Sequence, residues 1–489
     1  MAETKTYRGG TLIHLFGSLS EGAFNMLFTI VLVRLISQND FGSWRQFMSL
    51  AAIVWNITIF GLPASLFYFV SIAKPEERGA IARRTMWLAL SIGAVATVVF
   101  FFGLGLAANV YHSPKLSEEA LLFTSFFGLG FPMFIITPML VAADQRAVLA
   151  TMRFCMGLLR FASLALLVWM DADLRTLLIA LNGFAVIQFV VVVYLYLRAA
   201  GPALVPLKQG FDEQLKYSRH VSAMTVAGQL SVEMDKIFVS TYYTPEVFAS
   251  YSVGARELPF VPQIPYSITD SQVPHLSRFA SQGLFAEYFA LLHLWVRRIA
   301  LIMYPIFTMI LFQHREIFTI LFTAEYIDGA IPMLIIGCLI PMRVTSHYQL
   351  LLTLGASRDV MFASFAMLAS VLTFSFGLLH YLGPIGATLG FVISEYIIFS
   401  YMILRIAQRT DSSIARVLPW GFLLKLLATA VVCGALALPV LGIVPFETTF
   451  WRFAVYAATM MILYTAAVIT FGLVSKEDIA LLRSKLKRG

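Results

Sequence analysis

Charged residues are scarce in this sequence. Asp, Glu, Lys and Arg make up 13% of the 489 residues, whereas hydrophobic residues make up 59%. Soluble domains usually contain about 25% charged residues, roughly twice this fraction. The composition therefore excludes a water-soluble globular fold and favours a protein whose helices are surrounded by lipid.

Cysteine is also rare, and Cys155, Cys338 and Cys433 fall inside apolar stretches, where they act as small packing residues. No phosphate-binding loop, nucleophile triad or metal-ligand cluster is evident. Asp171-Ala172-Asp173 superficially looks like the acidic metal motif of membrane glycosyltransferases, but it reads as a polar turn between two apolar segments. We therefore predict no catalytic residue, no metal and no cofactor, expect that the protein is not an enzyme, and exclude ATP as a direct energy source.

Long apolar runs recur from one end of the chain to the other. A helix of about 20 residues crosses a hydrocarbon core about 30 Å thick. We predict an all-α integral membrane protein with about fourteen transmembrane helices. Their expected limits are 11–36, 41–72, 80–109, 119–143, 147–170, 176–197, 217–241, 246–272, 296–313, 329–354, 360–380, 384–404, 420–443 and 450–473.

The basic residues lie mainly on one side of the predicted membrane. With a cytoplasmic N-terminus, only Lys115, Arg175, Arg315 and Arg452 fall in the outer segments. This asymmetry follows the positive-inside rule, so both termini should be cytoplasmic. The net charge of +8 then reflects topology rather than nucleic-acid binding. We also expect no removable signal peptide, because no cleavage site follows a brief apolar core near the N-terminus.

The chain divides into two similar halves. We predict an N-terminal six-helix lobe over 1–200, a cytoplasmic linker over 201–216, a C-terminal six-helix lobe over 217–408, and an extra helix pair with a basic cytoplasmic tail over 409–489. Phe41-Gly42-Ser43-Trp44 and Phe248-Ala249-Ser250-Tyr251 open equivalent spans of the two halves. Six spans per half make the repeats parallel, related by an axis along the membrane normal.

Polar residues form stripes on the spans that open each half. Spans 11–36 and 217–241 repeat polar residues at intervals of three and four, which place them on one helical face. These residues either form hydrogen bonds between helices or line a cavity. The ionisable ones favour a cavity, because a charge near the bilayer centre costs at least about 2.5 to 3.5 kcal/mol. The uncharged residues expected to line it are Asn25, Asn56, Gln229 and Gln263.

Basic residues inside the predicted spans are the candidate binding groups. Arg153 and Arg160 are seven positions apart and share a helical face. We expect Arg160 to lie nearest the bilayer midplane. The residues predicted to line one cavity are Arg45, Arg153, Arg160, Lys236, Arg256 and Arg343.

Two carboxylates are candidates for ion coupling. Glu21 lies midway along the first span, where burial favours its protonated form and would let it exchange a proton. The alternative is a permanent ion pair between Glu21 and an arginine across the cavity. Glu233 can pair with Lys236 three positions later.

Short segments in a fixed order carry a family resemblance. They are Asp40-Phe41-Gly42 followed by Gly61-Leu62-Pro63, Asp235 followed by 251–256, Val273-Pro274-His275-Leu276-Ser277, Leu321-Phe322-Thr323-Ala324-Glu325-Tyr326 and Gly383-Pro384-Ile385-Gly386-Ala387-Thr388. Over nearly its whole length, the sequence resembles the Wzx-type oligosaccharide flippases of the multidrug/oligosaccharidyl-lipid/polysaccharide (MOP) exporter superfamily.

The resemblance implies a function that composition does not show. Such proteins have two six-helix lobes around a central cavity and move a polyprenyl-diphosphate-linked oligosaccharide from the inner to the outer leaflet by alternating access, for surface or exopolysaccharide assembly. The basic cavity residues would then attract the diphosphate. The expected partners are this glycan, membrane lipids, and glycan polymerase or glycosyltransferases, with no nucleic acid and a functional monomer.

The similar lipid II flippases also have fourteen spans and basic cavity residues. Arg256 lies where that subgroup has a basic residue, but the acidic position one turn later is Pro259 here. One alternative is a multidrug or cation antiporter of the same superfamily, although its site should be acidic and aromatic. The other is a membrane glycan polymerase or ligase, against which the short outer loops argue.

Overall fold

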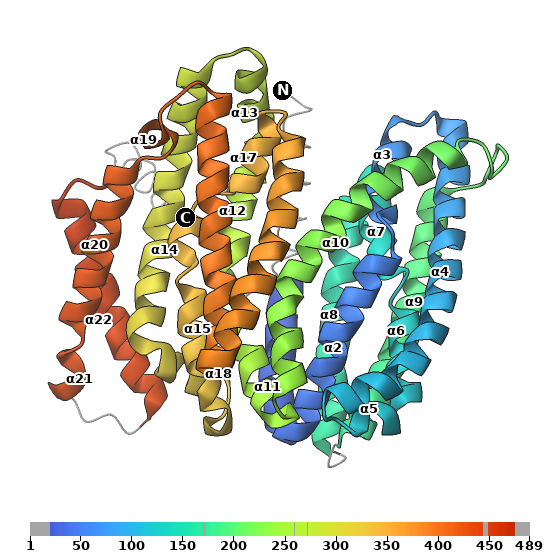
Figure 1. Cartoon of the computed structure of the whole chain (residues 1–489), viewed down its shortest axis with the longest axis horizontal. Coiled ribbons are helices and arrows are strands. Elements are labelled where there is room, and N and C mark those ends of the chain that lie inside the picture. The colour runs from blue at the N-terminus through green and yellow to red at the C-terminus, as the bar shows by residue number, and fades with distance from the viewer. Residues whose placement is uncertain (1–19, 170–172, 259, 271, 444–447, 475–489) are drawn as a thin grey trace. The chain divides into compact units, whose positions relative to one another are not determined.

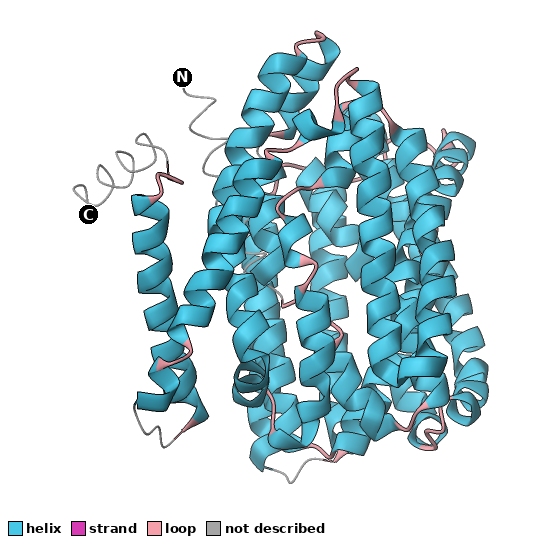
Figure 2. Cartoon of the chain, turned by 60° about the vertical axis from the view of Figure 1, so that its left-hand side comes forward, coloured by secondary structure: helices cyan, strands magenta, loops and turns pink. Residues whose placement is uncertain are grey.

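The computed structural model describes residues 20–169, 173–258, 260–270, 272–443 and 448–474. Within these ranges the chain consists of helices joined by loops and turns, with no strand (Figure 2). The all-α prediction is confirmed. The start of the first predicted span, Pro259, Asp171, Ala172 and the basic tail lie outside the described residues.

Within the described residues, every predicted span falls on helical segments. The first half of the chain contains a helix over residues 20–35, followed by α2 (Gln38–Thr58), α3 (Leu62–Ile72), α4 (Pro75–Val110), α5 (Lys115–Glu118), α6 (Ala120–Leu129), α7 (Met133–Ala142), α8 (Arg146–Trp169) and α9 (Leu174–Ala200). The second half contains α10 (Phe211–Tyr242), α11 (Pro245–Gly254), α12 (Phe260–Asp270), α13 (Val273–Ser281), α14 (Phe285–Leu321), η1 (Ala324–Gly329), α15 (Ala330–Gly337), α16 (Ile340–Arg343), α17 (His347–Thr353), α18 (Ser357–Arg409), α19 (Ile414–Val417), α20 (Trp420–Ala437), α21 (Val440–Ile443) and α22 (Thr449–Thr470).

Fewer helices than the fourteen predicted spans are, each by itself, both long and apolar enough to cross a membrane. Among the described residues, 8 helices are long and apolar enough to cross a membrane, or up to 10 if each bent pair is one span. The 53-residue α18 counts once, although a non-helical residue at Gly383 separates the two spans predicted within it. The described part of the first predicted span, residues 20–35, is too short to count, and α10 does not count because charged and polar residues recur along it.

The helices bend where glycine and proline occur close together in the sequence. α2 and α3 meet at 44°, where Gly61 has φ 65° and Pro63 lies in the first turn of α3. In α18, Gly383 has φ 62° and precedes Pro384. After this turn the chain runs back beside the first part of α18, where Ser375 Oγ donates to the Ala387 carbonyl at 2.9 Å. Left-handed backbone suits glycine because no Cβ collides with the carbonyl oxygen.

Two compact units can be distinguished, and each is described separately. Unit 1 comprises 1–252 and 364–391, and unit 2 comprises 253–363 and 392–489. In unit 1, α10 packs against α2 and α3, while α4 packs against α6 and α9 (Figure 1). In unit 2, α14 packs against α15, α20 and α22. The predicted division into lobes and linker is not tested by these units and stays a prediction.

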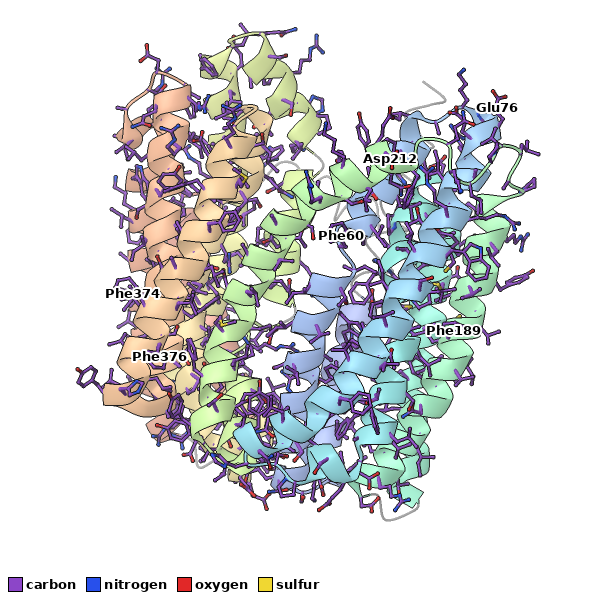
Figure 3. The ribbon with its side chains drawn as sticks, turned by 45° about the vertical axis from the view of Figure 1, so that its right-hand side comes forward. Phe60, Glu76, Phe189, Asp212, Phe374 and Phe376 are labelled. Carbon is purple, nitrogen blue, oxygen red and sulfur yellow. The ribbon has the colours of Figure 1, made fainter. Side chains whose placement is uncertain are left out.

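Apolar side chains on unit 1 point away from the protein. On α4, Trp87 and Phe102 are 64% and 75% exposed. Figure 3 shows Glu76 and Asp212 at one end of unit 1, whereas Phe189 lies midway along α9. A helix that faces lipid exposes apolar side chains along its middle and carries charged residues at its ends. The chain is a multi-pass membrane protein.

Side-chain hydrogen bonds hold the end of the predicted cytoplasmic linker and the start of α9. Arg84 donates to the carbonyls of Leu207 and Gly210 at 3.3 and 3.2 Å, and to Gln214 Oε1 at 2.6 Å. Asp173 caps α9 by accepting from the Thr176 backbone N–H at 2.8 Å, and this hydrogen bond lowers the pKa of Asp173. Asp173 thus acts as a helix cap.

Candidate functional site

A cavity of about 230 Å³ lies within unit 1. Four of its polar lining residues come from two helices: Glu21 and Asn25 from the helix over 20–35, and Arg153 and Arg160 from α8. All four were predicted as site residues. Its apolar walls include Met48, Trp55, Phe126, Met133, Phe134, Met152, Met156 and Phe184.

The two arginines have different partners. Arg153 Nε lies 3.3 Å from Glu21 Oε2, and Arg153 also donates to Thr137 Oγ1 at 3.2 Å. Arg160 donates to Asn25 Oδ1 at 3.0 Å, and its guanidinium lies 4.3 Å from the centre of the Phe28 ring. The Glu21–Arg153 contact is the ion pair that the alternative to the coupling hypothesis predicts.

The charges in this cavity do not cancel. Two guanidinium groups face one carboxylate, and Glu21 is 41% exposed at its side chain against 17% for Arg153. The remaining positive charge suits an anion, and a guanidinium can bind phosphate oxygens through two parallel hydrogen bonds. The Met, Phe and Trp walls offer apolar contact beside this charge, so the cavity can bind part of an amphiphile with an anionic group.

Arg45 lies elsewhere in unit 1 and is buried at 8% exposure. Its Nε donates to Ser252 Oγ at 3.2 Å and its Nη2 donates to the Ser252 carbonyl at 3.4 Å. Ser252 is the position equivalent to Arg45 in the predicted repeat. Nearby, Gln38 donates to Ser250 Oγ at 2.8 Å. In this conformation Arg45 therefore joins α2 to α11, and it is not among the residues that line the unit 1 cavity.

Lys236 belongs to a buried polar group on α10. Its Nζ lies 3.2 Å from Asp235 Oδ1 and donates to the Val232 carbonyl at 2.6 Å. The Tyr251 hydroxyl donates to Asp235 Oδ2 at 2.6 Å. Asp235 is thus paired with its neighbour in the sequence, Lys236. Glu233, three positions before Lys236, is buried at 6% exposure.

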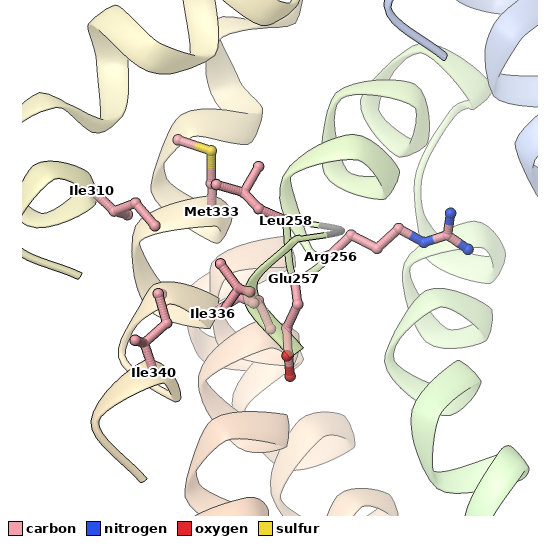
Figure 4. A pocket seen from close by; sticks show the side chains of 9 residues that line it. Arg256, Glu257, Leu258, Ile310, Met333, Ile336 and Ile340 are labelled. Atoms are coloured by element: carbon pink, nitrogen blue, oxygen red, sulfur yellow. The ribbon is translucent and has the colours of Figure 1, made fainter. Parts of the chain in front are cut away.

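The remaining two basic residues belong to unit 2. Arg343 donates to Glu257 and lies near Glu395, as described below. Arg256 is exposed and borders a small cavity of about 10 Å³ with Glu257 and apolar side chains. Figure 4 shows Arg256 pointing away from Ile310 and Ile336, with Glu257 turned in another direction. Glu257 is therefore paired with Arg343, which is distant in the sequence, and not with the adjacent Arg256.

Three uncharged candidates lie outside the unit 1 cavity. Asn56 donates to the Ala52 carbonyl of its own helix at 2.7 Å, and Gln229 and Gln263 are half-buried. Four of the six basic residues belong to unit 1 and two to unit 2, and the prediction that all six line one cavity stays a prediction.

Sequence reasoning missed the apolar walls. Nothing in a run of Met, Phe and Leu shows which face of a transmembrane helix meets lipid and which meets a cavity. One available signal was the position of Met152 and Met156 on either side of Arg153 in α8. Residues beside a membrane-buried arginine share its environment.

The fold and this cavity together define a class: an all-α, multi-pass membrane protein with a net positive, partly apolar cavity among its helices. The family model described as "Polysaccharide biosynthesis protein" matches residues 8–280, more than half of the chain. The chain belongs to the polysaccharide biosynthesis protein family. No curated protein sequence matches it.

Solved structures share this fold. The chain superposes on a lipid II flippase MurJ in an inward closed conformation with a TM-score of 0.70 and 13% identity, covering 94% of this chain and 98% of that one. An inward-facing multidrug resistance MATE family transporter of the MOP superfamily matches with a TM-score of 0.65 and 12% identity, over 82% and 99% of the two chains. A mutant of the MATE transporter VcmN of Vibrio cholerae matches with a TM-score of 0.52 and 15% identity, over 84% and 97%. The resemblance to MOP exporters is confirmed.

Proposed function

We propose that this protein moves a polyprenyl-diphosphate-linked oligosaccharide from the inner to the outer leaflet of a bacterial cytoplasmic membrane. The observation that carries the proposal is the unit 1 cavity, where Arg153 and Arg160 outnumber Glu21 beside apolar walls. A cargo with a diphosphate, a glycan and a lipid tail offers both kinds of contact. The polysaccharide biosynthesis family supports a glycan as the cargo.

The mechanism proposed is alternating access without covalent chemistry. The cavity of about 230 Å³ can hold the diphosphate region of such a cargo but not all of it, so lipid and glycan would extend beyond the cavity. Arg45, Lys236, Arg256 and Arg343 would contact the diphosphate at other stages of transport. The partners proposed are glycan polymerase or glycosyltransferases, with a monomer as the functional unit.

A multidrug or cation antiporter is the second candidate. Four methionines and several aromatic rings line the same cavity, and such adaptable apolar walls suit lipophilic compounds. The positive charge of the cavity argues against a cationic drug, because like charges repel in a poorly hydrated site.

Substitution of the cavity arginines tests the proposal. Replacing Arg160 by Ala should lower glycan export about tenfold or more, because hydrogen bonds to a charged group contribute about 1.5 to 3 kcal/mol. Lys should restore part of the export, since it keeps the charge but not the planar pair of donors. Export is measured as surface polysaccharide, with protein abundance as the control. Normal export by the Ala variant would contradict the role of Arg160.

A further inference from the structure

A buried charge cluster in unit 2 lies apart from the cavity in unit 1. Arg343, at the end of α16, donates to Glu257 Oε1 at 3.0 Å from Nε and 2.5 Å from Nη2. The same Nη2 lies 3.5 Å from Oε1 of Glu395, in the second part of α18. One guanidinium therefore bridges two carboxylates from different segments.

The cluster carries one negative charge too many if both carboxylates are ionised. Side-chain exposure falls from 20% at Glu257 to 15% at Arg343 and 8% at Glu395. An uncompensated charge becomes more costly as water is withdrawn from it, so Glu395 bears most of this cost.

The excess negative charge is least stable on the second carboxylate oxygen of Glu395. Glu395 Oε2 is inaccessible to solvent and accepts no hydrogen bond from the residues that the structure describes. Buried polar atoms of native proteins usually have a partner, and an exception calls for a ligand or a proton. A proton on this oxygen would neutralise the cluster and leave Oε1 facing Arg343.

The surrounding side chains leave Glu395 as the proton acceptor. Tyr348 of α17 faces both Glu395 and Arg343, and Tyr266 of α12 faces Arg343. His347 is buried, its Nδ1 lies 3.3 Å from the Thr345 carbonyl, and its Nε2 also has no hydrogen-bond partner among the described residues. A proton on His347 would add a second positive charge near Arg343, whereas a proton on Glu395 removes an excess negative charge. A cavity of about 30 Å³ beside Arg343, lined by both tyrosines, has room for water and would give a proton access.

We propose that Arg343, Glu257 and Glu395 form a proton-binding site, with the proton on Glu395, and that proton occupancy is coupled to transport. Ionised Glu395 strengthens the attachment of α18 to Arg343, whereas protonated Glu395 weakens it, so the proton changes how firmly these segments are held together. The binding of a proton stands on this geometry alone. Its coupling to transport rests on the proposed function.

Infrared spectroscopy of the purified full-length protein tests proton binding directly. The wild type should show the carbonyl band of a buried carboxylic acid at acidic pH, and the band should disappear at alkaline pH. Glu395→Gln should lose this pH-dependent band. Asp144→Asn is the matched control, because the Asp144 side chain is 91% exposed and its variant should keep the band.

Several outcomes would overturn proton binding at Glu395. One is the absence of the band from the wild type, and another is its persistence in Glu395→Gln. The third is loss of the band when NaCl is added at constant pH and ionic strength, which would assign the site to Na⁺. Size-exclusion elution identifies any variant that is misfolded, and Glu395→Asp then serves as the second variant, in which the band should shift but remain.

Transport in vesicles tests the coupling separately. A pH gradient should stimulate translocation by the wild type and not by Glu395→Gln. If the wild type moves no lipid-linked glycan at all, the proposed function fails while the infrared result still decides proton binding. If Glu395→Gln responds to the gradient as the wild type does, the coupling is wrong.

Discussion

Arg153 and Arg160 show how two residues on one helical face acquire different surroundings. They are two turns apart on α8, as their spacing predicts, yet Arg153 meets a carboxylate and Arg160 meets an amide and an aromatic ring. Arg160 contacts an amide and an aromatic ring and shares Glu21 with Arg153, so its charge is less fully neutralised than that of Arg153. Arg160 is therefore the stronger candidate for direct contact with the cargo.

The ion pair of Arg153 leads to a prediction for Glu21. Glu21→Gln should leave the pH dependence of transport unchanged, because Glu21 already has a positive partner at 3.3 Å and the proton is assigned to Glu395. The variant should also bind an anionic cargo no more weakly than the wild type, since it raises the net positive charge of the cavity. Transport rates in vesicles over a range of pH measure both effects.

A changed pH or ion dependence of transport in Glu21→Gln would support the coupling hypothesis for Glu21. The double variant Glu21→Gln with Glu395→Gln separates the two sites. If Glu395 alone binds the coupled proton, the double variant behaves as the single Glu395 variant does.

At the scale of the element, the reversal within α18 depends on one residue. Gly383 has φ 62°, and a Cβ built there would lie 3.1 Å from the Tyr243 hydroxyl oxygen. The packing at Gly386 is closer still, since a Cβ there would lie 2.0 Å from the Leu378 carbonyl oxygen. Close approach of two helices in a membrane requires such small residues.

Gly383→Ala should destabilise the protein by about 1 to 3 kcal/mol, because φ 62° with ψ −148° is a backbone conformation that essentially only glycine adopts. Gly377→Ala is the matched control in the same element, because a Cβ there meets nothing within 4 Å. Thermal unfolding in detergent measures both variants. Equal stability of the two would mean that the conformation at Gly383 is not what sustains the turn.

The sequence predicts elements better than it predicts contacts. In the part of the chain that the structure describes, the expected spans lie on helices, because a long apolar run identifies a helix in lipid. The partners of the site residues depend on which helices pack together, which no periodicity reveals. Thus the shared face of Arg153 and Arg160 could be predicted, whereas the pairing of Arg343 with Glu257, and not Arg256 with Glu257, could not.

At the scale of the whole molecule, the charge asymmetry predicts one orientation. Both termini and the 201–216 linker should face the cytoplasm, because nearly all basic residues then lie on the inner side. Single cysteines placed at positions 208 and 485, in a variant without the native cysteines, should react with a membrane-impermeant reagent only after the cells are opened. Labelling of either position in intact spheroplasts would refute the orientation.

The central claim is that the unit 1 cavity moves an anionic lipid-linked glycan. The most direct measurement is translocation of a fluorescent polyprenyl-diphosphate oligosaccharide by purified protein in liposomes, followed by quenching from outside. The wild type should equilibrate the lipid between leaflets, the Arg153→Ala/Arg160→Ala variant should not, and ethidium should not compete. Transport of ethidium with no movement of the lipid, or full activity of the double variant, would contradict the account.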